Sequence, residues 1–392
     1  MIVLSRNIGF EGYVRPDGNV GVRNHVLVIP TVVCSSYAAK EISNAVNGST
    51  YILHQHGCAQ AGADLEQTFR ILSGFGKNPN VASVLIVALG CEAISCEKLA
   101  DEISKSGKPV ETLTIQEENE LKETVEKGVN IVRKFVEEAS HLRRKKVDLS
   151  GLVVAVECSG SDWTSGIASN PAVGYAADLI IDNGGRVVFS ETTEIIGGEH
   201  ILAKRCVDDK VKEKLFKAVS RVIERAKREG IDLIGTNPSP GNIKGGLSTI
   251  EEKSLGAILK SGSKPIIDIL EYGEEIPKEK GCYFMDTPGH DVESICGMVA
   301  GGAQLVVFTT GRGTPTGNPI VPVIKVTGNP DTFKKMPDVI DIYVGIIEKK
   351  ETVEEAGKRI FETILEVASG LKTRSEINKN KEFAVFRTGF TY

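Results

Sequence analysis

The chain has 392 residues, of which 41% are hydrophobic and 25% are charged, an ordinary composition for a globular protein. This length predicts two or three domains with enough chain to bury a core. Lys and Arg total 47 against 52 for Asp and Glu, so the net charge is −5 and no general affinity for nucleic acid or anionic membranes is expected. No apolar run approaches the roughly 20 residues of a membrane helix. Residues 1–10 lack a signal-peptide pattern, so we expect a cytoplasmic protein.

The eight cysteines are too few for a disulfide scaffold in a chain of this length. We expect them to be core thiols, metal ligands or nucleophiles. Glycine is abundant, with 41 residues against an average share of about 7%, and many glycines directly follow apolar runs. Glycine at such positions lets the backbone approach a ligand closely.

The first part of the chain alternates between short apolar runs and segments with helical spacing. Strands are predicted at 26–29, 51–53, 84–89 and 110–115, and helices at 36–46 and 64–74. One long amphipathic helix is predicted over 117–146, and we interpret its basic run 143–146 as a solvated helix end. We place the domain boundary there, between N-terminal (1–147) and C-terminal (148–392) α/β domains.

The second part repeats this alternation. Strands are predicted at 152–156, 186–189, 232–234, 265–270 and 304–309, and helices at 170–183, 211–229 and 250–261. Residues 339–371 again show helical spacing, whereas 1–21 and 372–392 are polar and irregular. The order predicts an α/β fold with two Rossmann-like, doubly wound parallel sheets and a crevice between them.

Polar, glycine-rich segments follow most of the predicted strands. Ligands bind beyond the carboxyl ends of parallel strands, so these segments are expected to meet at one crevice or at two facing ones. The segments are 31–35, 54–58, 90–92, 157–162, 190–200, 237–242 and 309–313.

A metal site is the first chemistry that these segments indicate. His54, His56 and Cys58 alternate, so an extended backbone would point all three to one side, with Glu92 nearby. Two imidazoles, a thiolate and a carboxylate can hold a transition metal. Isolated histidines and cysteines are more often packed than metal-bound, and no paired CxxC spacing occurs.

The positions of the cysteines favour the metal site over ordinary packing. Four of the eight follow predicted strands: Cys34, Cys58, Cys91 and Cys158. Three or four such thiolates from separate loops could instead ligate an iron–sulfur cluster. The two histidines favour a single ion.

Candidate substrate ligands lie in the later loops. Arg312 stands between two glycines after a predicted strand, which suits bidentate binding of a carboxylate, although a surface-loop arginine needs no function. Arg23 is a weaker candidate. The proline-rich segment 237–242, with Asn237 and Asn242 at its ends, is rigid and can form the wall of a pocket.

Candidate catalytic groups are fewer. His200 can form an acid–base pair with Glu199, or it can simply lie on a helix face. Lys253 is either a surface helix charge or a catalytic ammonium. The chain has no P-loop, no Gly-x-Ser-x-Gly elbow and no Gly-x-Gly-x-x-Gly after a strand.

Motifs along nearly the whole chain carry a family resemblance. They read GYVRPDG (12–18), VGVRN (20–24), HQHGCAQ (54–60), LGCE (89–92), ECSGSD (157–162), SETTE (190–194), NPSPGN (237–242), TIEEKS (249–254), MDTPG (285–289) and FTTGRG (308–313). In this order they resemble the altronate dehydratase/galactarate dehydratase family of sugar-acid hydro-lyases. Ser159 stands where that family commonly has Gly.

The resemblance implies elimination of water from an aldonate or aldarate, giving a 2-keto-3-deoxy acid, with a requirement for Fe²⁺ or, in its place, Mn²⁺. A divalent ion and an arginine near the carboxylate would stabilise the charge that develops during such a reaction. Arg312 is the expected carboxylate ligand, and Glu191 or His200 the proton shuttle. The pool of expected metal ligands is Cys34, His54, His56, Cys58, Cys91, Glu92 and Cys158.

The resemblance also bears on partners. Single-chain members usually begin with a small SAF-type domain, which this sequence does not show, so it resembles the large subunit of two-chain members such as sulfolactate sulfo-lyase. Three functions therefore stay open: a sugar-acid dehydratase, a sulfo-lyase, and a non-catalytic subunit that needs a small SAF-type chain. We expect a small sugar acid as substrate, a homo-oligomer, and no nucleic acid or membrane partner.

Overall fold

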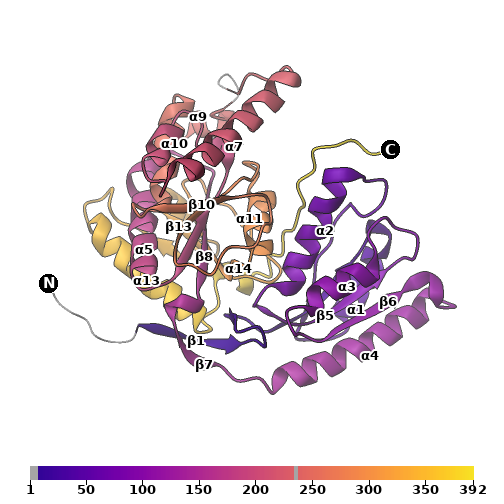
Figure 1. The fold of residues 1–392 in the computed structure, drawn as a ribbon. Coiled ribbons are helices and arrows are strands. Elements are labelled where there is room, and N and C mark those ends of the chain that lie inside the picture. Colours follow the sequence, from indigo (N-terminus) through magenta and orange to yellow (C-terminus); the bar gives the residue numbers. More distant parts are fainter. Residues whose placement is uncertain (1–7, 234–236) are drawn as a thin grey trace.

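The computed structural model describes residues 8–233 and 237–392, which form two α/β blocks, each built on a parallel sheet (Figure 1). The sheet of the first block has the order β4-β3-β5-β6. Its strands are β3 (His25–Pro30), β4 (Ser49–Tyr51), β5 (Val81–Ala88) and β6 (Val110–Thr114). Apolar side chains fill both faces of β5, as expected for a strand covered by helices on each side.

The second block has a seven-stranded parallel sheet with the order β10-β11-β9-β8-β12-β13-β14. The strands are β8 (Val153–Ser159), β9 (Arg186–Phe189), β10 (Ile266–Leu270), β11 (Gly281–Met285), β12 (Leu305–Thr310), β13 (Val323–Thr327) and β14 (Ile342–Tyr343). The chain builds outward from β8 in one direction through β9 and in the other through β12. Two parallel sheets confirm the predicted α/β fold class.

Helices cover both sheets. In the first block they are α1 (Ser36–Asn44), α2 (Gly62–Lys77), α3 (Cys96–Ser104) and α4 (Leu121–Ser140). In the second block they are α5 (Asn170–Asp182), α6 (Glu199–Ala203), α7 (Asp209–Arg228), α9 (Pro240–Lys244), α10 (Ile250–Ala257), α11 (Asp291–Ala300), α12 (Pro330–Lys335), α13 (Val353–Ala368) and α14 (Arg374–Ile377). In the part of the chain described, no helix is long and apolar enough to cross a membrane.

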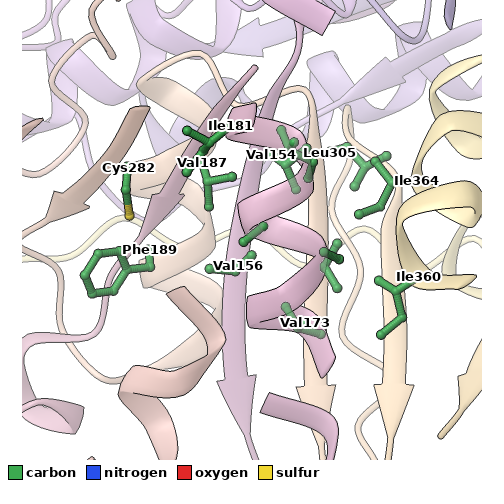
Figure 2. Close-up of a cluster of buried hydrophobic side chains, with 14 of the residues drawn as sticks. Val154, Val156, Val173, Ile181, Val187, Phe189, Cys282, Leu305, Ile360 and Ile364 are labelled. Carbon is green, nitrogen blue, oxygen red and sulfur yellow. The ribbon is translucent and has the colours of Figure 1, made fainter. Parts of the chain in front are cut away.

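The core is layered. Helices α5 and α13 pack on one face of the large sheet, where Val154, Val173 and Ile360 belong to one buried cluster (Figure 2). The other face shares a second cluster with the small sheet, because α2, α3 and α11 lie between the two sheets. Apolar side chains of this second cluster are buried between the two blocks and hold them together. Burial of apolar surface is the main stabilising term in folding.

A third, antiparallel sheet lies where the blocks meet. It has the order β2-β1-β7, with β1 (Gly9–Val14), β2 (Val20–Gly21) and β7 (Lys145–Asp148). The basic run is therefore not a solvated helix end: α4 stops at Ser140, and Lys145 and Lys146 pair with β1. Arg144 donates hydrogen bonds to the carbonyls of Glu11, Val22 and Ala368.

Other differences from the sequence prediction have identifiable causes. The strand predicted at 232–234 is absent from the described residues: Asp232 is irregular, Leu233 is helical, and residue 234 lies outside them. Residues 1–21 and 372–392, which gave no pattern, contain β1, β2 and α14 within their described parts. The sequence analysis also missed β11, β13 and β14, whose local pattern is too short to separate from a buried helix segment.

Candidate active site

A cavity of about 340 Å³ opens beyond the carboxyl ends of β8 and β12. This is the point where the strand order of the large sheet reverses direction, the usual position of ligands in open α/β sheets. The loops after β8, β9 and β12 and the start of α11 contribute its walls. The lining residues are Cys158, Ser159, Gly160, Ser161, Glu191, Glu194, Ser239, Gly241, Asn242, Lys253, Gly289, Asp291 and Arg312.

Three carboxylates meet at this edge of the sheet. Glu157, Glu191 and Asp291 each offer an oxygen, and these oxygens all lie within 4.8 Å of one another. Glu157 Oε2 accepts hydrogen bonds from Ser190 and Ser294, whereas its Oε1 is buried with no partner in the described structure. Burial, and then the charge of Glu191, raise the pKa of Glu157 well above its ordinary value. A cation bound among the carboxylates would offset both the burial of the Glu157 charge and its repulsion by Glu191.

Glu191 is held by its backbone. Its φ of 72° lies in the left-handed region, which a residue with a side chain adopts at an energetic cost. Its N–H donates to Thr287 Oγ1 at 2.9 Å, and its carboxylate accepts from the Cys158 N–H at 3.1 Å. This strained turn directs the Glu191 carboxylate to the end of β8.

Lys260 is the buried cation beneath the three carboxylates. Only 1% of its surface is exposed, and its Nζ pairs with Glu191 and lies 3.0 Å from Cys158 Sγ. Burial lowers the pKa of Lys260, but the Glu191 carboxylate opposes this effect, and the net shift raises the pKa above the ordinary value. Lys260 therefore stays charged and orients Glu191.

A second ion pair lies in the same cavity. Lys253 Nζ contacts Glu194 Oε1 at 2.8 Å and Asn237 Oδ1 at 2.9 Å. Burial raises the pKa of Glu194, and its Oε2 has no hydrogen-bond partner among the described residues. Glu194 is thus a carboxyl group suited to proton transfer, with Lys253 holding it in place.

The loops at the mouth of the cavity are tied together by Arg312 and Asn242. Arg312 Nη1 donates to the Gly241 carbonyl at 2.7 Å, and the rest of its guanidinium lies at the cavity wall. The Asn242 side chain accepts from Ser239 and donates to the Ser161 carbonyl, so it shapes the loop. Asn237 Oδ1 accepts a hydrogen bond from Lys253 Nζ.

The predicted residues His200 and Arg23 lie away from this cavity. His200 is exposed on α6 and does not line it. Arg23 is buried at the block boundary, where it forms an ion pair with Glu376 at 2.6 Å and donates to three backbone carbonyls. Its guanidinium therefore has a structural role, and its placement contradicts substrate binding.

The predicted metal pool divides between the two sheets. Cys158 belongs to the large sheet, and the remaining residues lie in loops of the small sheet. Burial raises the pKa of the Cys158 thiol well above its ordinary value, so Cys158 is a neutral thiol beside Lys260 and not a ready metal ligand. The single centre expected from the sequence is therefore replaced by two separate regions.

His54 and His56, in the loop after β4, form hydrogen bonds with backbone groups. His54 Nε2 lies 2.8 Å from the Pro30 carbonyl, and its Nδ1 accepts from the His56 N–H. Burial lowers the pKa of His54 to about 4. His56 Nε2 contacts the Val385 carbonyl at 3.0 Å, and its buried Nδ1 has no partner within the described ranges. The placement of His54 argues against a metal role for it.

The remaining members of the pool lie in loops joined by backbone hydrogen bonds, from the Val33 N–H to the His56 carbonyl and from the Ala93 N–H to the Gly57 carbonyl. Cys34, Cys58 and Cys91 are exposed, and each follows a strand of the small sheet. The Glu92 carboxylate accepts hydrogen bonds from Thr31 Oγ1 and from the N–H groups of Leu89 and Gly90. Glu92 is therefore occupied in holding these loops.

Sequence reasoning missed four residues of the cavity region as functional candidates: Glu157, Glu194, Lys260 and Asp291. Glu157 and Glu194 lie in the segments 157–162 and 190–200, which the sequence analysis expected to line the crevice. From these segments it chose the neighbouring Cys158 and Glu191 as the candidates. Asp291 follows the MDTPG motif directly. Lys260 carried no signal, because a helical lysine looks like a surface charge until its burial is known.

Two family models match this chain. Residues 12–140 match the family model described as D-galactarate dehydratase/altronate hydrolase, second domain. Residues 149–391 match the model described as D-galactarate/altronate dehydratase, C-terminal. The candidate cavity therefore lies wholly in the part that matches the C-terminal model.

Three relatives are similar over most of their length. The (2R)-sulfolactate sulfo-lyase subunit beta of Chromohalobacter salexigens is 41% identical over 96% of this chain and 97% of its own. Altronate dehydratase of Bacillus subtilis is 36% identical over 99% of this chain and 79% of its own. Galactarate dehydratase (L-threo-forming) of Escherichia coli is 36% identical over 93% and 73%. The chain therefore belongs to the D-galactarate/altronate dehydratase family of lyases.

Proposed function

We propose that the chain catalyses a metal-dependent elimination of water from a sugar acid of the altronate or galactarate type, giving a 2-keto-3-deoxy acid. The observation that carries this proposal is the group formed by Glu157, Glu191 and Asp291 at the cavity beyond β8. The elimination removes the proton on C2 and the hydroxyl on C3, releases water, and leaves an enol that becomes the 2-keto acid.

The three carboxylates fit a divalent cation such as Fe²⁺ or Mn²⁺. Carboxylate oxygens are hard ligands that suit such ions, and the unpartnered Oε1 of Glu157 is a free ligand atom in a buried site. When bound, the ion supplies Lewis acidity toward the substrate carboxylate and hydroxyl oxygens. Lys260 orients Glu191 for this role through their ion pair.

The remaining charged groups of the cavity divide between binding and proton transfer. Arg312 binds the substrate carboxylate, since a guanidinium matches its two oxygens. Glu194, whose pKa is raised by burial, accepts the proton from C2 and passes it to the departing hydroxyl. Lys253 holds Glu194 in place through their ion pair.

A substrate panel tests the proposal. The full chain, prepared anaerobically with Fe²⁺ or Mn²⁺, is incubated with altronate and galactarate, and the 2-oxo acid is measured. We expect Glu157→Gln and Asp291→Asn to lose bound metal and activity together. Glu251→Gln, an exposed change on α10, serves as the control and should keep both. Full activity in both carboxylate variants would overturn the metal assignment.

A second candidate is elimination of sulfite from sulfolactate. It is favoured by the 41% identity to a sulfo-lyase subunit beta over nearly the full length of both chains. The same cavity would serve, with the C–S bond at C3 breaking in place of the C–O bond. Release of pyruvate and sulfite from sulfolactate, with no turnover of either sugar acid, would decide for this reaction.

A small SAF-type chain is the proposed partner for either reaction. The support is the word "subunit" in the name of the sulfo-lyase relative, and the two dehydratases, which extend beyond the matched part. If the chain alone is inert and the added small chain restores turnover, the two-subunit form holds. Full turnover by the chain alone would remove the need for a partner.

A further inference from the structure

Three exposed thiols lie at one edge of the small sheet. Cys34 follows β3, Cys58 follows β4 and Cys91 follows β5. These strands are parallel neighbours, so their carboxyl ends reach the same edge. The three cysteines come from loops that the mechanism proposed for the large sheet does not use.

Backbone hydrogen bonds hold the three loops against one another. The Val33 N–H donates to the His56 carbonyl at 3.0 Å, which ties the Cys34 loop to the Cys58 loop. The Ala93 N–H donates to the Gly57 carbonyl at 2.9 Å, which ties the Cys58 loop to the Cys91 loop. Each cysteine is thus within two residues of a bond between loops.

Two glycines with positive φ lie beside the cysteines in these loops. At Gly57, where φ is +102°, a Cβ atom would lie 2.2 Å from the Thr31 carbonyl oxygen. At Gly90, where φ is +122°, a Cβ atom would lie 2.7 Å from Gln116 Oε1. The Gln116 amide also lies 3.6 Å from Cys91 Sγ. A side chain at Gly57 would clash with the backbone of Thr31 and Val32, so glycine at this position permits the close approach of the Cys58 loop to the Cys34 loop.

The other cysteines contrast with these three. Burial raises the pKa of Cys96 and Cys296 to about 12 and that of Cys282 to about 11, so these side chains are core thiols. Cys158 belongs to the site in the large sheet. Cys34, Cys58 and Cys91 are therefore the thiols that solvent and metal can reach.

We propose that Cys34, Cys58 and Cys91 hold an iron–sulfur cluster. Three thiolates from separate loops are soft ligands that suit iron and sulfide. Among the described residues, the group of three or more candidate ligands within 4.8 Å of one another consists of carboxylates, so at least one pair of the three sulfur atoms lies farther apart than this limit. A tetrahedral zinc site needs sulfur atoms about 3.8 Å apart, given a Zn–S bond of about 2.3 Å. A cluster spans the wider separation because inorganic sulfide and several irons lie between the thiolates.

In a cluster of four irons, three cysteines would leave one iron without a cysteine ligand. Both oxygens of Glu92 are engaged by Thr31 and by backbone N–H groups, and both nitrogens of His54 contact the backbone. The exposed cysteines would leave such an iron open to a small oxygen or nitrogen ligand, and His56 Nδ1, in the Cys58 loop, has no hydrogen-bond partner in the described structure.

Reconstitution of the full chain tests the proposal. The chain is incubated anaerobically with iron, sulfide and a thiol reductant, desalted, and analysed for iron, acid-labile sulfide and visible absorption. We expect equal amounts of iron and labile sulfide, more than one of each per chain, and the broad absorption of an iron–sulfur cluster. Cys34→Ser, Cys58→Ser and Cys91→Ser should each lose most of the sulfide and the absorption.

Two controls separate this site from the rest of the molecule. Cys206→Ser changes a half-buried thiol of the large block and should keep the cluster. Glu157→Gln should lose activity but keep labile sulfide, so the two metal proposals fail independently. Iron bound without sulfide, or full sulfide in the three serine variants, would overturn the cluster. A zinc content of one per chain that needs all three thiols would replace it with a single-ion site.

Discussion

The side-chain nitrogen of Lys260 lies 3.0 Å from the sulfur of Cys158, and both side chains are buried. The same nitrogen pairs with the Glu191 carboxylate. The contact joins the helical turn after α10 to the end of β8, where the candidate cavity opens. A buried cation at this position offsets part of the charge of the carboxylates above it.

Removing this cation should destabilise the protein. Lys260→Met leaves Glu191 buried without its partner, which typically costs about 3–5 kcal/mol in the free energy of unfolding. Urea denaturation of the metal-free chain measures the change. Lys264→Met is the matched control, because its ion pair with Asp182 is partly exposed and should contribute less than about 1 kcal/mol. Equal effects of the two variants would show that Lys260 is not an essential cation.

Arg312 should control substrate affinity more than turnover. Arg312→Met removes a charged hydrogen-bonding group from the cavity wall, which is worth about 1.5–3 kcal/mol, or roughly ten- to a hundredfold in KM. Steady-state kinetics on the substrate identified by the panel measures this. Lys244→Met, an exposed cation on the neighbouring helix α9, should leave KM unchanged. A loss confined to kcat would contradict the assignment of carboxylate binding.

A pH effect on stability is expected at Lys325, far from these groups in the chain. Its side chain is fully buried on β13, and its Nζ has no hydrogen-bond partner in the described structure. Burial lowers its pKa from 10.5 to about 8, although Asp341 raises it. Between these two values the unfolded chain binds more protons than the folded one, so stability should rise with pH across this window.

The matching substitution is Lys325→Met. It should raise the free energy of unfolding at neutral pH by about 3 kcal/mol, the equivalent of the pKa shift, and abolish the rise with pH. Thermal or urea unfolding at a series of pH values provides the measurement. A variant less stable than the parent chain at pH 7 would show that the ammonium has a stabilising partner.

The C-terminal segment should detach when one carboxylate is removed. Asp64, at the start of α2, accepts hydrogen bonds from the N–H groups of Thr388 and Gly389 and pairs with Arg387 at 3.4 Å. In Figure 1 this segment runs beside α2. Asp64→Ala leaves these donors unpaired, at about 1–3 kcal/mol. Limited trypsin digestion should then cleave after Arg387 several times faster, whereas Asp101→Ala, an exposed change on α3, should not alter the rate.

Local pattern determined much of the fold. Continuous apolar runs located β3, β5, β8, β9 and β12, because a parallel strand is buried on both faces and needs no polar alternation. The position of polar, glycine-rich loops after these strands also located the segments that line the cavity. Glu191 and Arg312, which line the cavity, stand in these segments, whereas Lys253 lies on a helix outside them.

Only the tertiary structure decided which of these segments meet. The cysteines share a sequence setting, yet Cys158 lies with Lys260 on the large sheet, whereas Cys34, Cys58 and Cys91 follow strands of the small one. Strand order and the hydrogen bonds of each histidine depend on contacts between residues far apart in the chain. Lys260 shows the physical reason most directly: the same lysine is a surface charge or a buried partner of Glu191 according to what packs around it.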